Sequence, residues 1–220
     1  MDAQNIVALD HLKAALPGLA AQARERAGEI EAARQLPHDF VVQLNFAGVY
    51  RVHVSRDQAA LGGDLLDWLH MATTLAEADA STGWASGHGA VCSALIANLA
   101  DPMASAAWSN LPRIEAEQTK GGLRISGRWG FGTGCTDVTY VGGMVPLPDP
   151  TNEGESRFFA ALAPVSEARI DKTWGPVGLA GTGSHDIVFD DVFVPDERIF
   201  EWPNGTPVNA YPYAIFTPGT

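Results

Sequence analysis

The chain of 220 residues is 46% hydrophobic and carries a formal net charge of −12. That hydrophobic content suffices for one large or two small cores, and the acidity, with no basic run, argues against a nucleic-acid or anionic membrane partner. Its two cysteines, Cys92 and Cys135, are too few for a disulfide framework or a cysteine-rich zinc site. Because the N-terminus lacks a signal-peptide pattern and no apolar run has membrane-spanning length, we expect a soluble, cytoplasmic protein.

Apolar residues at helical spacing dominate the first half of the chain. This spacing predicts helices over residues 10–36, 39–47, 64–80, 84–99 and 101–110. Pro17 and Gly18 are expected to break or kink the first helix, and Ser81-Thr82-Gly83 to separate the third from the fourth. Residues 49–54 alternate and are expected to be extended.

After Pro112 the chain changes to short runs of strand-like composition. Such runs cover residues 113–119, 123–128, 138–145, 158–163 and 187–194, and Lys120-Gly121-Gly122 separates the first two as a hairpin turn does. We therefore predict an α+β protein with a helical domain over residues 1–112 and a mainly antiparallel β domain over residues 113–200. Residues 201–220 form no clear element and are interpreted as a connector.

The segment from Leu123 to Gly134 begins as a strand and then becomes rich in glycine. Trp129 and Phe131 lie two residues apart, so an extended chain would project both to one face, followed by Thr133. Aromatic rings, one hydroxyl and an accessible backbone suit a flat heteroaromatic ligand. The alternative is a glycine-rich bend of the sheet with packed aromatic side chains.

His88 shares a predicted helical face with Trp84, one turn earlier. One interpretation is a core histidine with its hydrogen bonds satisfied, and the other is a base or hydrogen-bond donor at a cleft. The remaining histidines are scattered and none stands at metal-ligand spacing, so we predict no metal site.

Residues 175–186 form a glycine-rich loop with hydroxyl side chains. The loop has no phosphate-loop lysine, does not lie between a strand and a helix, and contains no Gly-x-Ser-x-Gly elbow. It either lines a ligand with its backbone N–H groups or merely turns the chain.

Three stretches together resemble the acyl-CoA dehydrogenase superfamily, and within it the two-component flavin-dependent monooxygenases. They are Leu75-Ala76-Glu77-Ala78-Asp79-Ala80-Ser81-Thr82-Gly83-Trp84, the segment Ser126 to Gly134, and the segment Trp174 to Pro195. The resemblance extends from about residue 20 to residue 200. Ala180 departs from the arginine that this branch carries in its "G-L-R-G" pattern.

The resemblance implies a helical domain, a central β-barrel and a C-terminal helical bundle, which this sequence does not contain, with reduced FMN or FAD at their junction. It implies that flavin contacts Trp129, Phe131, Gly132, Thr133 and Gly134. Thr133 would lie beside the flavin N5, with His88 as a second catalytic residue, and Trp84, His88 and Trp174 would face the substrate.

The activity implied is hydroxylation or N-oxygenation of a small organic molecule by O₂, with reduced flavin supplied by a separate reductase. The expected assembly is a homo-oligomer, or a complex with a partner chain that supplies the bundle. Two alternatives remain open: an acyl-CoA dehydrogenase-like oxidoreductase, and a non-catalytic flavin-binding module that requires a partner.

Overall fold

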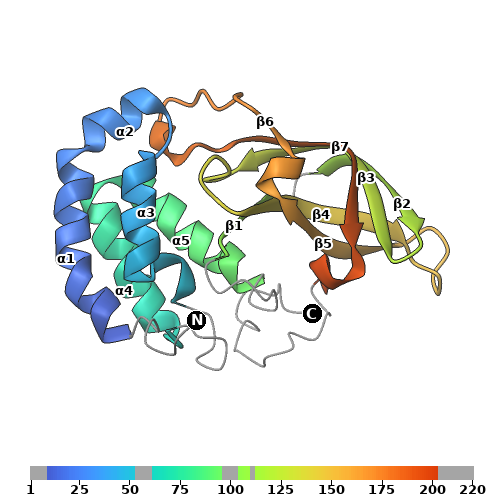
Figure 1. Cartoon of the computed structure of the whole chain (residues 1–220), viewed down its shortest axis with the longest axis horizontal. Coiled ribbons are helices and arrows are strands. Elements are labelled where there is room, and N and C mark those ends of the chain that lie inside the picture. The colour runs from blue at the N-terminus through green and yellow to red at the C-terminus, as the bar shows by residue number, and fades with distance from the viewer. Residues whose placement is uncertain (1–8, 53–60, 96–103, 110–111, 203–220) are drawn as a thin grey trace.

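The computed structural model describes residues 9–52, 61–95, 104–109 and 112–202. Within these residues, five α-helices lie at one end of the molecule and two four-stranded sheets at the other (Figure 1). The predicted α+β class, with helices first and mainly antiparallel strands after them, is confirmed. In this part of the chain the eight strands form two separate sheets and not the single closed barrel that we expected.

The helices are α1 (Leu9–Glu25), α2 (Ala27–Ala33), α3 (His38–Ala47), α4 (Leu65–Ala78) and α5 (Ala80–Leu95). The stretch 10–36 is thus two helices rather than the one predicted. Pro17 lies inside α1, so the helix is not broken there. Leucines on one face of α1 are buried on both sides of Pro17, and their packing outweighs the single backbone hydrogen bond that proline removes.

The ends of α3 and α4 follow their local sequence. Gly48 ends α3 with φ +90°, a backbone conformation that favours glycine. Asp64 begins α4 with a capping box, in which its side chain accepts from the backbone of Asp67 and that of Asp67 accepts in return. After Gly48 the chain forms a 3₁₀ turn, Val49–Arg51, so the prediction of an extended segment is wrong there, and residues 53 and 54 lie outside the described residues.

The helix α5 begins one turn earlier than predicted. The Asp79 carboxylate accepts from both the backbone N–H and the hydroxyl of Thr82, at 2.6 and 2.7 Å, and so caps the helix. Gly83 lies within α5, where an added Cβ would approach the Cα of Ala76 to 2.4 Å. The Ser81-Thr82-Gly83 stretch is therefore a close crossing of α5 over α4 and not an interruption.

The strands are β1 (Ala106–Ser109), β2 (Pro112–Thr119), β3 (Gly122–Gly132), β4 (Tyr140–Pro148), β5 (Ser156–Pro164), β6 (Arg169–Asp171), β7 (His185–Pro195) and β8 (Ile199–Trp202). One sheet has the order β1-β4-β5-β8 and the other β2-β3-β7-β6. All five predicted strands and the hairpin at Lys120-Gly121 are confirmed. The helix predicted over residues 101–110 is wrong for residues 106–109, which form β1 parallel to β4, and residues 101–103 and 110 lie outside the described residues.

Trp129 fills the space between the two sheets. Its side chain is 0% exposed, its Nε1–H donates to the Met144 carbonyl at 2.9 Å, and its ring meets the Phe189 ring edge-on at 4.9 Å. Gly143 leaves room for it, because an added Cβ there would approach Trp129 Cδ1 to 2.3 Å. Trp129 is thus a core residue that holds β3 against β4.

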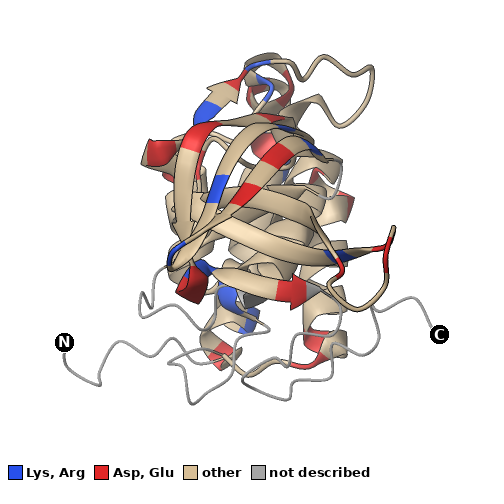
Figure 2. Cartoon of the chain, turned by 90° about the vertical axis from the view of Figure 1, so that its right-hand side faces the viewer, with Lys and Arg blue, Asp and Glu red and all other residues tan. Residues whose placement is uncertain are grey.

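Charged residues of both signs are interspersed on the strands that Figure 2 shows. Arg124 pairs with Asp191 at 2.8 Å, and Arg157 donates to Glu201 at 2.8 Å, each linking neighbouring strands. In the part of the chain that the structure describes, no helix is both long and apolar enough to cross a lipid bilayer.

Candidate functional site

A cavity of about 320 Å³ opens where the helices meet the sheets. This volume lies within the range of roughly 300–1,000 Å³ that is typical of small-molecule sites. Its lining comes from α5, the end of β1, the end of β3 with the turn after it, and the loop of residues 172–184 between β6 and β7, here called the β6–β7 loop. The lining residues are Trp84, His88, Trp108, Ser109, Phe131, Thr133, Trp174, Leu179, Thr182 and Ser184.

The end of β3 turns Phe131 away from Trp129. Phe131 has φ +61° and the pairing of β3 with β7 shifts register between Trp129 and Gly132, so the side-chain alternation is interrupted. Phe131 is 59% exposed, whereas Trp129 is fully buried. The prediction that both aromatic rings share one face is therefore wrong, and Trp129 does not line the cavity.

The two glycines of this turn have different roles. Gly132 allows β3 to lie close on β7, because an added Cβ would approach Ile187 Cδ1 to 2.6 Å. Gly134 has φ +72° and its N–H donates to the Thr182 carbonyl at 3.0 Å, which ties the turn to the β6–β7 loop. Neither glycine is among the lining residues of the large cavity.

Thr133 stands in a chain of hydrogen bonds that has one direction. Trp84 Nε1 lies 3.3 Å from Thr133 Oγ1, which lies 2.9 Å from Ser184 Oγ; Ser184 Oγ lies 2.8 Å from Thr182 Oγ1, which donates to the Leu179 carbonyl at 3.0 Å. An indole N–H only donates and a carbonyl only accepts. Each hydroxyl therefore accepts a hydrogen bond from the Trp84 side of the chain and donates one toward Leu179. Thr133 Oγ1 therefore keeps one lone pair for a donor and has no proton left to give.

Trp84 and His88 lie one turn apart on the cavity side of α5. Their rings are parallel within 5° at 6.2 Å, Trp84 is 54% exposed, and His88 Nε2 lies 3.3 Å from Cys92 Sγ. Burial lowers the pKa of His88, against a smaller opposing effect of its hydrogen bond with the Trp108 backbone. His88 is thus a neutral imidazole at neutral pH that faces both the core and the cavity, so it combines features of the two sequence interpretations.

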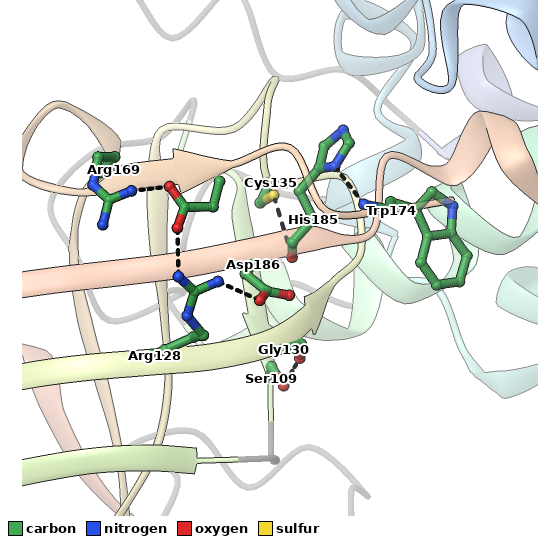
Figure 3. A network of polar contacts seen from close by, with 9 residues as sticks. Ser109, Arg128, Gly130, Cys135, Arg169, Trp174, His185 and Asp186 are labelled. Atoms are coloured by element: carbon green, nitrogen blue, oxygen red, sulfur yellow. Dashed lines mark hydrogen bonds and ion pairs between the residues drawn. The ribbon is translucent and has the colours of Figure 1, made fainter. Parts of the chain in front are cut away.

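Trp174 lies across the cavity in the β6–β7 loop. Its indole N–H donates to the Leu179 carbonyl at 3.1 Å, and its ring meets the Phe131 ring at 87° and 5.9 Å. The loop is anchored at both ends by Arg128 of β3, which pairs with Asp171 before the loop and with Asp186 Oδ2 after it, the latter at 2.6 Å (Figure 3). The two rings thereby form a corner of the cavity.

The structure brings together five of the residues predicted for the site: Trp84, His88, Phe131, Thr133 and Trp174. Trp129, Gly132 and Gly134 are not among the lining residues of the cavity. The sequence prediction did not single out Trp108 and Ser109, because their segment was expected to be helical. Thr182 and Ser184 belong to the loop for which lining a ligand was one of two open interpretations, and their hydroxyls were the available signal. Among the described residues, no three His, Cys, Asp or Glu side chains are grouped to hold a metal ion.

Comparison with known proteins finds relatives over most of the chain, although no family model matches it. The chain is 32% identical over 199 residues to the oxygenase component of FADH(2)-dependent resorcinol hydroxylase from Rhizobium sp. (strain MTP-10005), covering 86% of this chain and 48% of the relative. It is 32% identical over 198 residues to indole-3-acetate monooxygenase from Acinetobacter baumannii, covering 84% and 50%.

Among solved structures, the HsaA monooxygenase from M. tuberculosis superposes with a TM-score of 0.79 at 28% identity, covering 88% of this chain and 52% of the other. The chain spans about half the length of the curated relatives it matches.

Proposed function

We propose that this chain, which is homologous to the oxygenase components of two-component flavin-dependent monooxygenases, forms the flavin-facing part of such an enzyme. It would use reduced FMN or FAD and O₂ to hydroxylate or N-oxygenate a small organic molecule. The first relative is named as dependent on FADH(2), a reduced flavin. The two relatives are named for aromatic substrates, resorcinol and indole-3-acetate.

The lining of the cavity fits a planar heteroaromatic group. Phe131 and Trp174 offer ring faces and edges at right angles, and Trp84 offers an exposed indole. The oriented hydroxyl chain leaves Thr133 Oγ1 as an acceptor, and a reduced isoalloxazine carries an N–H at N5, whereas the oxidised ring has a lone pair there. The acceptor character of Thr133 is the observation that carries the proposal, because it favours the reduced form of the ring.

Bound reduced flavin would supply the activation of O₂, and the residues of this chain would do the rest. The exposed faces of Trp84 and Phe131 would be covered by the bound flavin ring and substrate, and the water-poor site so formed would favour transfer of oxygen to substrate over release of peroxide. His88, neutral at neutral pH, would accept the proton of a substrate hydroxyl or amine that replaces the weak Cys92 thiol contact at Nε2. Trp84, His88 and Trp174 would contact the substrate, and Phe131 and Thr133 the flavin.

The active enzyme would need further components. A separate reductase would supply reduced flavin, as the wording "oxygenase component" indicates for the relative. Residues 1–112 and 113–200 would form the helical and β domains, with the two sheets in the place of a β-barrel. Residues 201–220 would connect to a helical bundle, and the active enzyme would be a cytoplasmic homo-oligomer or a complex with a bundle-bearing partner.

Anaerobic titration of the chain with FMN and FAD, each oxidised and reduced, tests the proposal. We expect at least one reduced flavin to bind more tightly than its oxidised form, and addition of O₂ with resorcinol or indole-3-acetate to yield an oxygenated product. Oxidation of an acyl-CoA without O₂ would instead indicate the dehydrogenase-like reaction. Failure of every flavin to bind would contradict the proposal for this chain and favour a module that requires a partner.

A further inference from the structure

We propose that His185 and Arg34 are positioning residues for Trp174. They hydrogen-bond to its backbone, His185 at the N–H and Arg34 at the carbonyl, and so hold the aromatic wall of the cavity, formed by Trp174 and Phe131, in place. These two hydrogen bonds depend on the protein alone. Their bearing on oxygen chemistry rests on the proposed function.

Both polar groups of the Trp174 backbone have a partner from another element. The Trp174 N–H donates to His185 Nδ1 at 3.1 Å (Figure 3), and Arg34 Nη1, at the end of α2, donates to the Trp174 carbonyl at 3.2 Å. Arg34 itself has φ 56° and closes α2 with a hydrogen bond from its N–H to the Glu31 carbonyl. The wall residue is thus tied to the first residue of β7 and to the helical end of the molecule.

His185 is buried, and its backbone is held by neighbouring residues. His185 is 3% exposed, its N–H donates to the Gly183 carbonyl at 2.8 Å, and it pairs with Gly132 of β3. Because the Trp174 N–H can only donate, His185 Nδ1 must be the unprotonated nitrogen of a neutral ring. A protonated imidazole carries an N–H on both nitrogens and cannot accept this bond.

The surroundings keep His185 neutral. Burial and the charge of Lys172 lower its pKa, while Asp186 acts in the opposite sense and is itself paired with Arg128. Arg34 is the other charged group bonded to Trp174, at its carbonyl, and the Cys135 thiol lies 3.9 Å from the His185 carbonyl. The hydrogen bond from the Trp174 N–H to His185 Nδ1 is therefore formed at neutral pH and lost on acidification below the ordinary histidine pKa of 6.5, whereas the bond from Arg34 remains.

The two hydrogen bonds to the Trp174 backbone differ in strength. The bond to His185 is partly buried, whereas the bond from Arg34 is exposed at the surface. Loss of a buried partner costs more than loss of an exposed one. The amide of Trp174 should accordingly respond strongly to changes at His185 and weakly to changes at Arg34.

The test uses the flavin-free chain labelled with ¹⁵N-tryptophan, in which the backbone signal of Trp174 is identified among six tryptophans by its loss in Trp174→Phe. In His185→Phe, which has no acceptor, we expect amide exchange at Trp174 to accelerate by about tenfold or more. In His185→Asn the carboxamide oxygen replaces Nδ1, so protection persists. In this variant the chemical shift of the Trp174 amide should no longer change with the titration that the unsubstituted chain shows below pH 6.5.

His70→Asn, at an exposed position of α4, is the control and should behave as the unsubstituted chain. Unchanged protection of Trp174 in a folded His185→Phe chain would overturn the proposal. If His185→Phe does not fold, the pH comparison decides: an identical titration in His185→Asn and in the unsubstituted chain would overturn it. Because no flavin is present, these results are independent of whether the chain binds flavin.

Discussion

Trp84 and Thr133 lie 49 residues apart in the sequence and meet at the cavity, where the indole Nε1–H donates to the threonine Oγ1 at 3.3 Å. This bond joins the helical part of the molecule to the end of β3. It also sets the direction of the hydroxyl chain that continues to Ser184, because an indole nitrogen cannot accept. The relationship thus connects the packing of α5 against the β region with the hydrogen-bonding character of the site.

Removal of the Thr133 hydroxyl should weaken binding of reduced flavin. In Thr133→Val we expect the affinity for reduced FMN or FAD to fall about tenfold, the equivalent of one hydrogen bond of about 1–1.5 kcal/mol. The affinity for the oxidised form should change less, and more peroxide should be released per flavin oxidised. Anaerobic absorbance titration and a peroxide assay measure the two effects.

Thr133→Ser keeps the hydroxyl and should restore both properties. Thr73→Val is the matched control, since Thr73 lies on the exposed side of α4 and bonds only local carbonyls. Equal losses for the two flavin forms in Thr133→Val would contradict the acceptor role.

The sequence could predict several lining residues of the candidate site because these residues are chemically unusual. Phe131 and Thr133 stand out among glycines, and Trp84 and His88 share one helical face. Their side chains all line the cavity. What the sequence could not reveal is the orientation of Trp129, since a positive φ at Phe131 and a register shift in β3 break the two-residue alternation on which the prediction depended.

Non-local pairing explains the elements that were missed. Residues 104–109 are rich in alanine, a strong helix former, yet 106–109 form β1 because they pair with β4, which begins at Tyr140. β6 and β8 are only 3 and 4 residues long, too short for a periodic signal. Trp108 and Ser109 could therefore not be assigned to the cavity from the sequence.

Gly83 should be replaceable only at a cost, in contrast to Gly28. Gly83→Ala would place a methyl group 2.4 Å from the Cα of Ala76, and this backbone contact forces α5 away from α4, at a cost of about 1–3 kcal/mol in the free energy of unfolding. Gly28 in α2 has no atom within 4 Å of its added Cβ, so Gly28→Ala should stabilise the chain by about 0.4–1 kcal/mol. Urea denaturation of both variants measures the difference. A Gly83→Ala chain as stable as the unsubstituted one would mean that the helices do not cross this closely.

Substitution of Trp129 should mainly lower stability, whereas substitution of Trp174 should mainly weaken ligand binding. Trp129→Phe removes buried volume and the hydrogen bond to the Met144 carbonyl, so the free energy of unfolding should fall by about 1–3 kcal/mol. Trp174→Phe removes the indole bond to Leu179 at the cavity and should weaken ligand binding while changing stability by less than about 1 kcal/mol. Thermal denaturation and flavin titration on both variants check this. The opposite pattern would indicate that Trp129 contacts the flavin.

The stability of the chain should fall as the pH drops below about 6.5 because of two histidines. The pKa values of His88 and His185 are lowered in the folded state, chiefly by burial, so below the ordinary value of 6.5 the unfolded chain binds more protons than the folded one. The stabilisation is therefore present above pH 6.5 and lost as the pH falls toward the folded pKa values, at up to about 1.4 kcal/mol per pH unit for each histidine. Urea denaturation at pH 5, 6, 7 and 8 measures the slope, and His88→Gln should remove about half of it. His11→Gln, at an exposed position of α1, should leave the slope unchanged. A slope in His88→Gln equal to that of the unsubstituted chain would show that folding does not lower the pKa of His88.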